Sequence, residues 1–390
     1  MSSLWNRTIR EELQALSADH LNRHLIPTAD AHRPVLHRKG KRLVNFSSNN
    51  YLGLAGHPRM IQAMREAAEK GSGAGSSRLI IGHSEEAEAL EQELAAFKGT
   101  ESAVLFPNGY MANAGLLSSF LKPSDAVFSD QWNHASIVDG IRMSKARKYI
   151  YRHLDPDYLE SLLKTADQQG AGRKLIVTDT VFSMDGDVAP LRDLVELKKR
   201  YDAALVVDDA HGGGVFGDEG KGMAHELGVD REIDLYMGTF SKAFGVYGAY
   251  VAGKRDWIRY LINKCRPFIY TTALPPVIIA GIRASLRLVR DADRLRRELR
   301  QKSGWFRRQL TGLGLDVAGS ATQIIPVVVG ENEQALLFSH RLQEQGVLSV
   351  AIRPPTVPAG TARLRFSLMA NHREEDLRQA IEAIKLCCFA

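Results

Sequence analysis

The feature that most constrains this chain is a regular alternation of short β-branched runs with helical patterns between Tyr51 and about Pro275. Such alternation is typical of βαβ units, in which a mostly parallel sheet is covered by helices on both faces. Beyond Pro275 a long helical region reaches about Leu313, and strands then alternate with helices. Strands are predicted at residues 103–106, 126–129, 175–178, 204–207, 235–238 and 250–252, and later at 324–329 and 362–367.

This pattern predicts two domains, for which a chain of 390 residues is long enough. Residues 51–275 are expected to form a large α/β domain, and residues 276–390 a smaller α+β domain. Residues 1–50 are expected to give a helix and a connector that join the smaller domain. The first helix should be amphipathic, because Leu4, Ile9, Leu13 and Leu16 recur near one face.

Composition narrows the class of protein. The chain is 44% hydrophobic and 25% charged, which is ordinary for a globular protein, and no run of about 18 apolar residues predicts a membrane span. The N-terminus lacks the apolar core of a signal peptide, and three cysteines without metal-ligand spacing suggest a reducing cytoplasm. The net charge of +6 is scattered, so no nucleic-acid surface is predicted, whereas acidic small substrates fit.

The stretch GTFSKAFGVYG, residues 238–248, places Lys242 among small residues. A lysine that forms a Schiff base needs an uncrowded approach and surroundings in which it loses its proton. The hydroxyls of Thr239 and Ser241 would suit a phosphate oxygen held nearby. A surface lysine in a glycine-rich turn is the alternative interpretation, and the stretch alone does not decide between them.

Polar residues also follow other predicted strands, where ligands of open α/β sheets bind. In LVVDDAHGGG an apolar strand stops at Asp208, with His211 three residues on. A buried acid needs a cationic partner such as a protonated pyridine nitrogen, although an N-cap Asp before a turn is the alternative. Gly109 in FPNGYMANAG would open a helix whose amides favour phosphate. His134 and Ser183 follow further strands, where a structural histidine and a plain turn serine are the alternatives.

Together these segments resemble the α-oxoamine synthases, pyridoxal-phosphate enzymes of the aspartate-aminotransferase fold type (fold type I). The resemblance runs from about Arg23 to the last strand and rests on five motifs: NFSSNNYLGLAGHP, SDQWNHASIVDG, VFSMDGD, VVDDAH and GTFSKAFG. Two departures, Gly213 in place of the usual threonine and the varied Phe240–Ser241, remove no catalytic group.

The resemblance implies roles for individual residues. Lys242 matches the Schiff-base lysine that also moves protons at the substrate α-carbon, and Asp208 matches the acid at the pyridine nitrogen. His211 matches the histidine at the phenolic oxygen, and His134 matches the ring-stacking histidine, which could also polarise the thioester carbonyl. Further cofactor contacts are implied for Ser183, Gly109, Tyr110, Thr239, Ser241 and, from the partner subunit of a homodimer, Thr272.

The segment AIRPPTVPAGTARLRFS, residues 351–367, resembles the branch of the family that condenses L-alanine with a pimeloyl thioester in biotin biosynthesis. Arg353 would then bind the amino-acid carboxylate in a bidentate manner, although a surface arginine held by prolines is the alternative. Other implied substrate residues are Thr356, Arg23, Asn49 and Ser77. The rival interpretations are a glycine C-acetyltransferase and a non-catalytic partner subunit; coenzyme A and acyl-carrier protein both stay open as thiol carriers.

Overall fold

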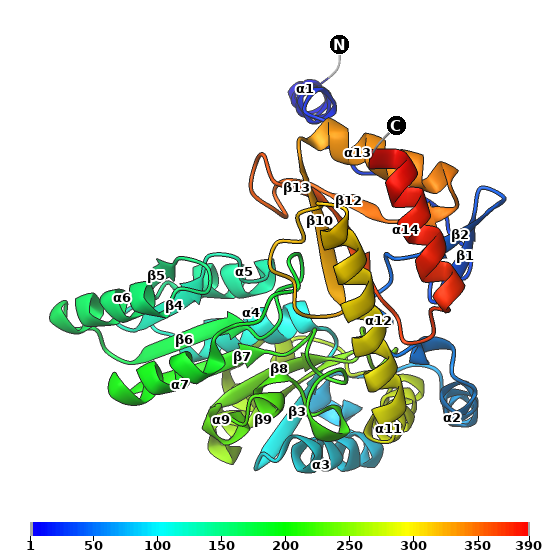
Figure 1. Ribbon diagram of the computed structural model, residues 1–390. Helices are drawn as coiled ribbons and strands as arrows, with labels where there is room; N and C mark the ends of the chain where they lie inside the picture. The colour runs from blue at the N-terminus through cyan, green and yellow to red at the C-terminus, as the bar shows by residue number, and fades with distance from the viewer. Residues whose placement is uncertain (1–2, 389–390) are drawn as a thin grey trace. The chain divides into compact units, whose positions relative to one another are not determined.

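The structure is a computed structural model that describes residues 3–388 (Figure 1). Contacts between backbone positions divide the chain into two compact units. The large unit comprises Asn50–Ser183 and Val188–Arg297, and the small unit comprises both ends of the chain, up to Asn49 and from Glu298, with Met184–Asp187. Residues 276–297 therefore group with the large unit, whereas the sequence placed the domain boundary at residue 275.

Within the described residues, the large unit contains a seven-stranded sheet in the order β3-β9-β8-β7-β6-β4-β5. Strands β5, β4, β6, β7 and β8 run parallel, and β9 is antiparallel to both β8 and β3. The predicted mostly parallel sheet is confirmed. Its strands are β3 (Ser102–Phe106), β4 (Ala126–Asp130), β5 (Arg147–Tyr151), β6 (Lys174–Asp179), β7 (Ala203–Asp208), β8 (Leu235–Thr239) and β9 (Ala249–Gly253).

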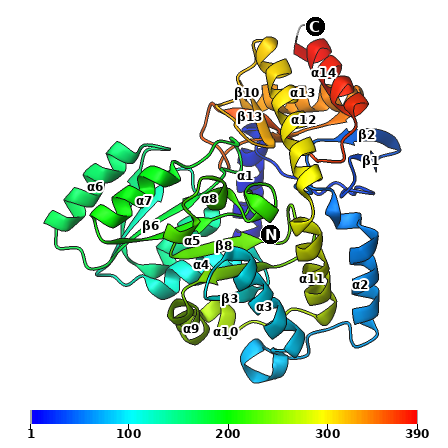
Figure 2. The same ribbon diagram turned by 60° about the horizontal axis from the view of Figure 1, so that its bottom comes forward.

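Helices cover both faces of this sheet, as Figures 1 and 2 show. Strand β7 carries Leu205, Val206 and Val207 in succession, each no more than 1% exposed, which requires a covered face on either side. The helices are α2 (Pro58–Ala68), α3 (Glu85–Lys98), α4 (Gly109–Phe120), α5 (Ala135–Ser144), α6 (Pro156–Gln168), α7 (Leu191–Arg200), α8 (Met223–Glu226), α9 (Arg255–Lys264), α10 (Arg266–Ile269) and α11 (Pro276–Arg290).

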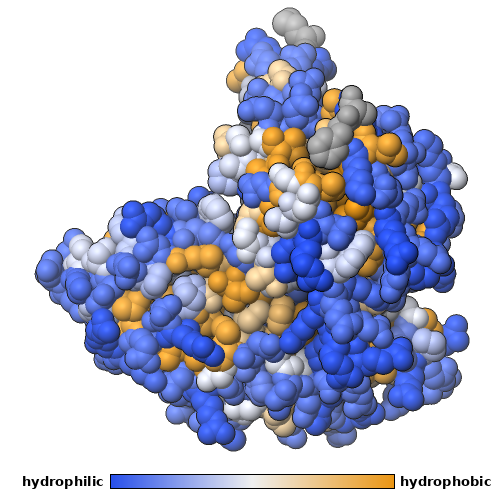
Figure 3. Space-filling model, in the orientation of Figure 1, coloured by the Kyte–Doolittle hydropathy of each residue, from blue (hydrophilic) through white to orange (hydrophobic). Residues whose placement is uncertain are grey.

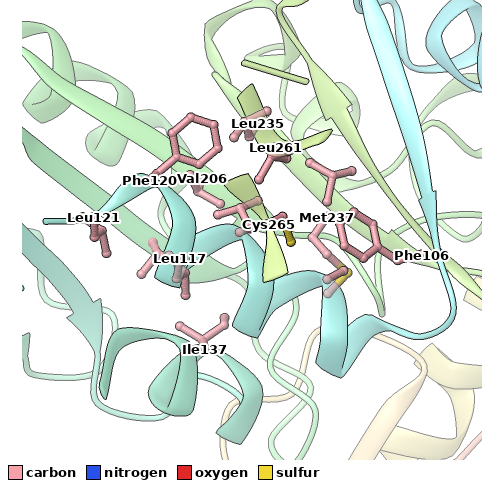
Figure 4. Packing of buried hydrophobic residues seen from close by; sticks show 14 of the residues in the cluster. Phe106, Leu117, Phe120, Leu121, Ile137, Val206, Leu235, Met237, Leu261 and Cys265 are labelled. Atoms are coloured by element: carbon pink, nitrogen blue, oxygen red, sulfur yellow. The ribbon is translucent and has the colours of Figure 1, made fainter. Parts of the chain in front are cut away.

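The core on one face of the sheet is formed by α4, α5 and α9 against the central strands (Figure 4). Leu117 of α4 and Ile137 of α5 pack with Val206 and Leu235 of the strands, and all four are fully buried. Helix α4 is apolar around most of its circumference, as expected of a helix buried between a sheet and other helices. The core thereby fixes where α4 begins, at the edge of the sheet.

The small unit contains two three-stranded sheets, β1-β2-β11 and β10-β13-β12, among its described residues. The Ser367 amide donates a hydrogen bond to the Phe46 carbonyl oxygen (2.7 Å) and joins the two. The elements are α1 (Leu4–Ala18), β1 (Val35–Arg38), β2 (Lys41–Asn45), β10 (Ile324–Gly330), α13 (Asn332–Glu344), β11 (Val347–Leu348), β12 (Val350–Ile352), β13 (Ala362–Ser367) and α14 (Glu374–Cys388), with most of α12 (Asp293–Gly312).

Hydrophobic residues are exposed at several places on the surface. In the view of Figure 3 it is mostly hydrophilic, with hydrophobic residues gathered in patches. The predicted N-terminal helix is confirmed as α1, and its apolar residues Leu4, Ile9 and Leu13 are between 49% and 68% exposed. Within residues 3–388, no helix combines the length and the apolar character needed to cross a membrane.

Candidate active site

Four neighbouring parallel strands end in polar residues at one edge of the large sheet. Strands β4, β6, β7 and β8 end at Asp130, Asp179, Asp208 and Thr239. In the register of the sheet, Asp208 lies between Asp179 and Met237. Side chains that follow these strands therefore gather at the carboxyl edge, the place where open α/β sheets bind ligands.

Asp208 is a buried acid, 3% exposed, at the centre of this edge. One carboxylate oxygen, Oδ1, accepts the Ala210 amide (2.9 Å), and the other, Oδ2, accepts Nδ2 of Asn113 on α4 (2.8 Å). The alternative interpretation, an Asp that caps a turn, is confirmed in part, because Asp208 caps the turn that follows β7 although no helix starts there. Its carboxylate closes this turn and faces α4.

Lys242 and His211 lie together at the same edge. Lys242 follows β8 by three residues, and its Nζ lies 2.7 Å from Nε2 of His211. The other ring nitrogen of His211, Nδ1, lies 2.6 Å from the hydroxyl of the fully buried Tyr51. Gly245 makes the turn possible, because its φ is +68° and a Cβ there would lie 2.5 Å from the Ala55 nitrogen.

His134 is held at the start of α5 by two hydrogen bonds. Its backbone amide donates to Oδ2 of Asp179 (2.8 Å), and its Nδ1 accepts the Ser136 amide (3.2 Å) as an N-cap. Burial lowers the pKa of the His134 imidazole, and the charge of Lys242 acts in the same direction, while Asp208 opposes both. His134 is therefore a neutral imidazole in a fixed position.

The start of α4 and the end of β8 lie side by side. Helix α4 begins at Gly109 behind an Asn108 cap, and a Cβ on Gly109 would be 3.9 Å from Cβ of Thr239. The Thr239 hydroxyl donates to the Gly248 carbonyl oxygen (2.9 Å) and accepts the Ser241 amide (3.2 Å). Exposed N–H groups at a helix start favour an anion such as phosphate.

The remaining predicted cofactor residues lie at the start of α4 and in irregular segments of the large unit. Tyr110 is 49% exposed and donates its hydroxyl to Asp139, and the Ser241 side chain is exposed. Ser183 is half-buried in the turn that follows β6. Ser77 and Thr272 form an isolated antiparallel bridge, so the structure brings together two residues that are distant in the sequence.

Four of the predicted substrate residues belong to the small unit. Arg353 donates Nη1 to the His20 carbonyl oxygen and Nη2 to that of Asn22 (3.2 Å). Arg23 donates in return to the Pro354 carbonyl oxygen (3.2 Å), and burial followed by the charge of Arg23 lowers the pKa of Arg353. The Thr356 amide closes a turn onto the Arg353 carbonyl oxygen (3.1 Å).

The fourth of these residues, Asn49, accepts a hydrogen bond at Oδ1 from Nη1 of the buried Arg365 (3.1 Å). The side-chain oxygen of Asn49 is thus directed to β13 within the small unit.

Sequence reasoning missed four residues of this edge: Tyr51, Asn113, Ser136 and Asp179. A local signal existed for two of them. Asn113 is four residues after Gly109, so both lie on the same side of α4, and Ser136 follows His134 at the spacing of a capping contact. Tyr51 and Asp179 gave no such signal, because their contacts join distant segments.

Comparison with known proteins assigns the family. The family model described as aminotransferase class I and II matches residues 41–384. The chain belongs to this family. An 8-amino-7-oxononanoate synthase of Geobacter sulfurreducens is 50% identical over 381 residues, which cover 97% of both chains.

Two solved structures extend the likeness. A serine palmitoyltransferase from S. paucimobilis with bound PLP is 30% identical, with a TM-score of 0.92 over 99% of this chain and 98% of that one. An 8-amino-7-oxononanoate synthase from Francisella tularensis is 29% identical, with a TM-score of 0.77 over 88% of this chain and 97% of that one. The predicted fold type is thereby confirmed.

The residues at the carboxyl edge of the large sheet in this chain fit pyridoxal phosphate. Lys242 supplies a primary amine for an aldehyde, and the buried carboxylate of Asp208 suits a protonated ring nitrogen. The start of α4 beside Thr239 suits a phosphate group. All of these groups belong to the large unit.

Proposed function

We propose that the chain is a pyridoxal-phosphate-dependent 8-amino-7-oxononanoate synthase. It would condense L-alanine with a pimeloyl thioester and release 8-amino-7-oxononanoate, carbon dioxide and the free thiol carrier. The observation that carries the proposal is the 50% identity to a curated 8-amino-7-oxononanoate synthase over 97% of both chains. The arrangement of Lys242, His211 and Asp208 supports it, because these groups suit proton transfer beside an electron-accepting ring.

Each side chain of the site has its own role in the proposed reaction. When bound, pyridoxal phosphate supplies an electron sink for the bonds at the amino-acid α-carbon. Lys242 takes and returns the α-proton through its Nζ, which the 2.7 Å contact with His211 holds in position. The Asp208 carboxylate keeps the ring nitrogen protonated. The neutral His134 donates a hydrogen bond to the acyl carbonyl oxygen, where negative charge develops.

The small unit supplies the charges for substrate carboxylates in this proposal. Arg353 would exchange its backbone partners, the His20 and Asn22 carbonyl oxygens, for the carboxylate of L-alanine. Arg23, which bonds to the adjacent Pro354 carbonyl oxygen, would serve the far carboxylate of the pimeloyl group. Thr356, Asn49 and Ser77 remain further candidates for substrate contact.

The proposal includes a homodimer. Leu79, Ile80 and Ile81 are consecutive and 50%, 76% and 83% exposed, and contiguous exposed apolar side chains are typical of an interaction site. Thr272 is exposed and bridges the neighbouring Ser77, so a partner subunit docked here would meet its hydroxyl. All three cysteines are described and free, which suits a reducing cytoplasm.

The test uses the purified protein loaded with pyridoxal phosphate. Thiol release is measured with L-alanine and pimeloyl-coenzyme A, and with two control pairs: glycine with acetyl-coenzyme A, and L-serine with palmitoyl-coenzyme A. We expect release for the first pair, together with the nine-carbon amino-ketone backbone of the product by mass spectrometry. Release only with a control pair would overturn the substrate assignment. Activity only with pimeloyl-acyl-carrier protein would keep it and identify the carrier.

A further inference from the structure

A chain of buried hydrogen bonds connects the carboxylate of Asp208 to the imidazole of His134. Nδ2 of Asn113 lies 2.8 Å from Oδ2 of Asp208 and 2.9 Å from Oγ of Ser136. Oγ of Ser136 lies 2.7 Å from Nδ1 of His134. Asn113 and Ser136 are 2% and 1% exposed, so water does not compete for these bonds.

The ionised carboxylate of Asp208 decides which atom donates in each of these hydrogen bonds. An ionised carboxylate only accepts hydrogen bonds, so the amide group of Asn113 must present its nitrogen, and not its oxygen, to Asp208. The second N–H of the same nitrogen then points to Oγ of Ser136. Because that oxygen accepts from Asn113, its own proton is left to donate to His134.

His134 consequently accepts at Nδ1 from two donors, the Ser136 hydroxyl (2.7 Å) and the Ser136 amide (3.2 Å). A neutral imidazole that accepts at Nδ1 carries its proton on Nε2. The charged groups that act on this ring are Asp208 and Lys242, and burial outweighs the attraction of Asp208. The ring is therefore neutral, with one defined donor.

We propose that Asn113 and Ser136 are positioning residues that hold His134 as the Nε2–H tautomer, so that it donates a hydrogen bond to the acyl carbonyl oxygen of the thioester. The inference rests on the proposed function for the identity of the acyl group. The tautomer itself follows from the contacts of the large unit. If the hydrogen bonds from Asp208 to His134 ran in the opposite direction, Nε2 of His134 would carry a lone pair. That lone pair would face the carbonyl oxygen of the thioester and repel it.

The direct test is nitrogen NMR of the holoenzyme labelled with ¹⁵N-histidine. The His134 signals are assigned by their loss in His134→Asn, and two-bond couplings distinguish a protonated Nε2 from a protonated Nδ1. We expect the Nε2–H tautomer in the unsubstituted protein. In Ser136→Ala the more distant Ser136 amide (3.2 Å) is the donor that remains of the two at Nδ1, so we expect a mixture of tautomers. An Nδ1–H tautomer or an imidazolium in the unsubstituted protein, or an unchanged spectrum in Ser136→Ala, would overturn the proposal.

Kinetics gives a second readout that a merely structural role would not move. Ser136→Ala should lower kcat for thiol release about tenfold and leave the KM for L-alanine within about twofold, because an oriented donor acts on the acyl step. Ser136→Thr keeps the hydroxyl and should restore kcat. The matched control is Ser144→Ala on the same helix, whose hydroxyl donates to the Ile141 carbonyl oxygen (2.6 Å), and its kcat should not change.

Asn113→Leu provides an independent variant if Ser136→Ala folds poorly, since it removes both N–H donors at similar volume. It should produce the same mixture of tautomers as Ser136→Ala. A pure Nε2–H signal in Asn113→Leu would contradict the proposal that Asn113 sets the tautomer of His134. The NMR result does not depend on turnover. A holoenzyme without synthase activity would sink the proposed function while the tautomer measurement still decides the inference.

Discussion

At the scale of single residues, the side chains of the site are paired, and one member of each pair holds the other in position. His211 stands between Tyr51 and Lys242, with contacts of 2.6 Å and 2.7 Å on its two ring nitrogens. Both ring nitrogens of His211 are thereby engaged in hydrogen bonds. Tyr51 contacts His211 and therefore acts on Lys242 indirectly.

Replacement of Tyr51 by phenylalanine tests this indirect action. Loss of one hydrogen bond to His211 should lower kcat/KM for thiol release about fivefold to tenfold, as expected for roughly 1 kcal/mol. Tyr149→Phe is the matched control, because its hydroxyl bonds to the exposed Gln169 (2.7 Å) and should leave kcat/KM unchanged. Equal losses in the two variants would show that Tyr51 has no specific role.

At the scale of elements, a buried ion pair fastens helix α3 to the loop after β7. Nζ of Lys98, the last residue of α3, lies 3.3 Å from Oδ2 of Asp209 and 4.2 Å from the ring centre of Tyr236. Burial lowers the pKa of Lys98 and raises that of Asp209. Asp209 also accepts from Thr180 (2.8 Å), and it directly follows the site residue Asp208.

Lys98→Met should strongly destabilise the protein. Removal of one partner leaves the Asp209 carboxylate buried without its cation, which typically costs about 3–5 kcal/mol of unfolding free energy. Urea unfolding at neutral pH measures the loss. Lys164→Met, at an exposed pair on α6, should change stability by at most about 1 kcal/mol. A loss in Lys98→Met no larger than that of the control would contradict the account of this ion pair.

A second element, the turn between β13 and α14, makes stability depend on pH. His372 accepts the Met369 amide at Nδ1 (3.0 Å) and contacts the Asn45 carbonyl oxygen through Nε2 (3.0 Å). Burial lowers the pKa of His372 from 6.5 to about 4. Between these values the unfolded chain binds the proton and the folded chain does not, so stability falls as pH falls from 6.5 towards 4.

The full shift in the pKa of His372 corresponds to roughly 3 kcal/mol of unfolding free energy. Urea unfolding across this pH range would measure it. His372→Gln should be less stable at pH 7 and should lose this part of the pH dependence. His340→Gln, at an exposed histidine of α13, should keep it. A His372→Gln protein with the same slope as the unsubstituted protein would place the titration elsewhere.

At the scale of the whole molecule, the proposed homodimer would cover the exposed apolar residues of Leu79–Ile81. The segment Leu79–Ile81 lies in a single turn of π-helix, Arg78–Gly82, beside the Ser77–Thr272 bridge. Ile80→Asp should weaken the dimer at least tenfold in sedimentation, because it places a charge in an apolar interface. Leu337→Asp, exposed on α13, is the control and should not. A dimer unaffected by Ile80→Asp would exclude this segment from the interface.

Much of the large unit could be predicted from the sequence, because strand ends and turn motifs are local signals. Strand β5 (RKYIY) was missed because it lies at the edge of the sheet, begins with two charged residues and is buried only in part. The start of helix α4 at Gly109 was predicted and is confirmed, whereas helix α5 was obscured by its glycine and short polar residues. The long helical region after Pro275 divides at Asp291, which ends α11.

Contacts between distant segments could not be predicted. The Asn113–Ser136 bond spans 23 residues and the Tyr51–His211 contact spans 160, so neither leaves a periodic trace in the sequence. Arg353 was interpreted as a carboxylate clamp, and nothing in its sequence neighbourhood indicated that it binds the carbonyl oxygens of His20 and Asn22.

The central claim is that the cofactor is anchored by Lys242 at the carboxyl edge of the large sheet. The most direct measurement is reduction of the holoenzyme with borohydride, followed by peptide mapping with mass spectrometry. The account predicts one modified lysine, Lys242, and no modification in Lys242→Ala. A pyridoxyl label on Lys98, the other lysine buried near this edge, or on any surface lysine instead of Lys242 would contradict it.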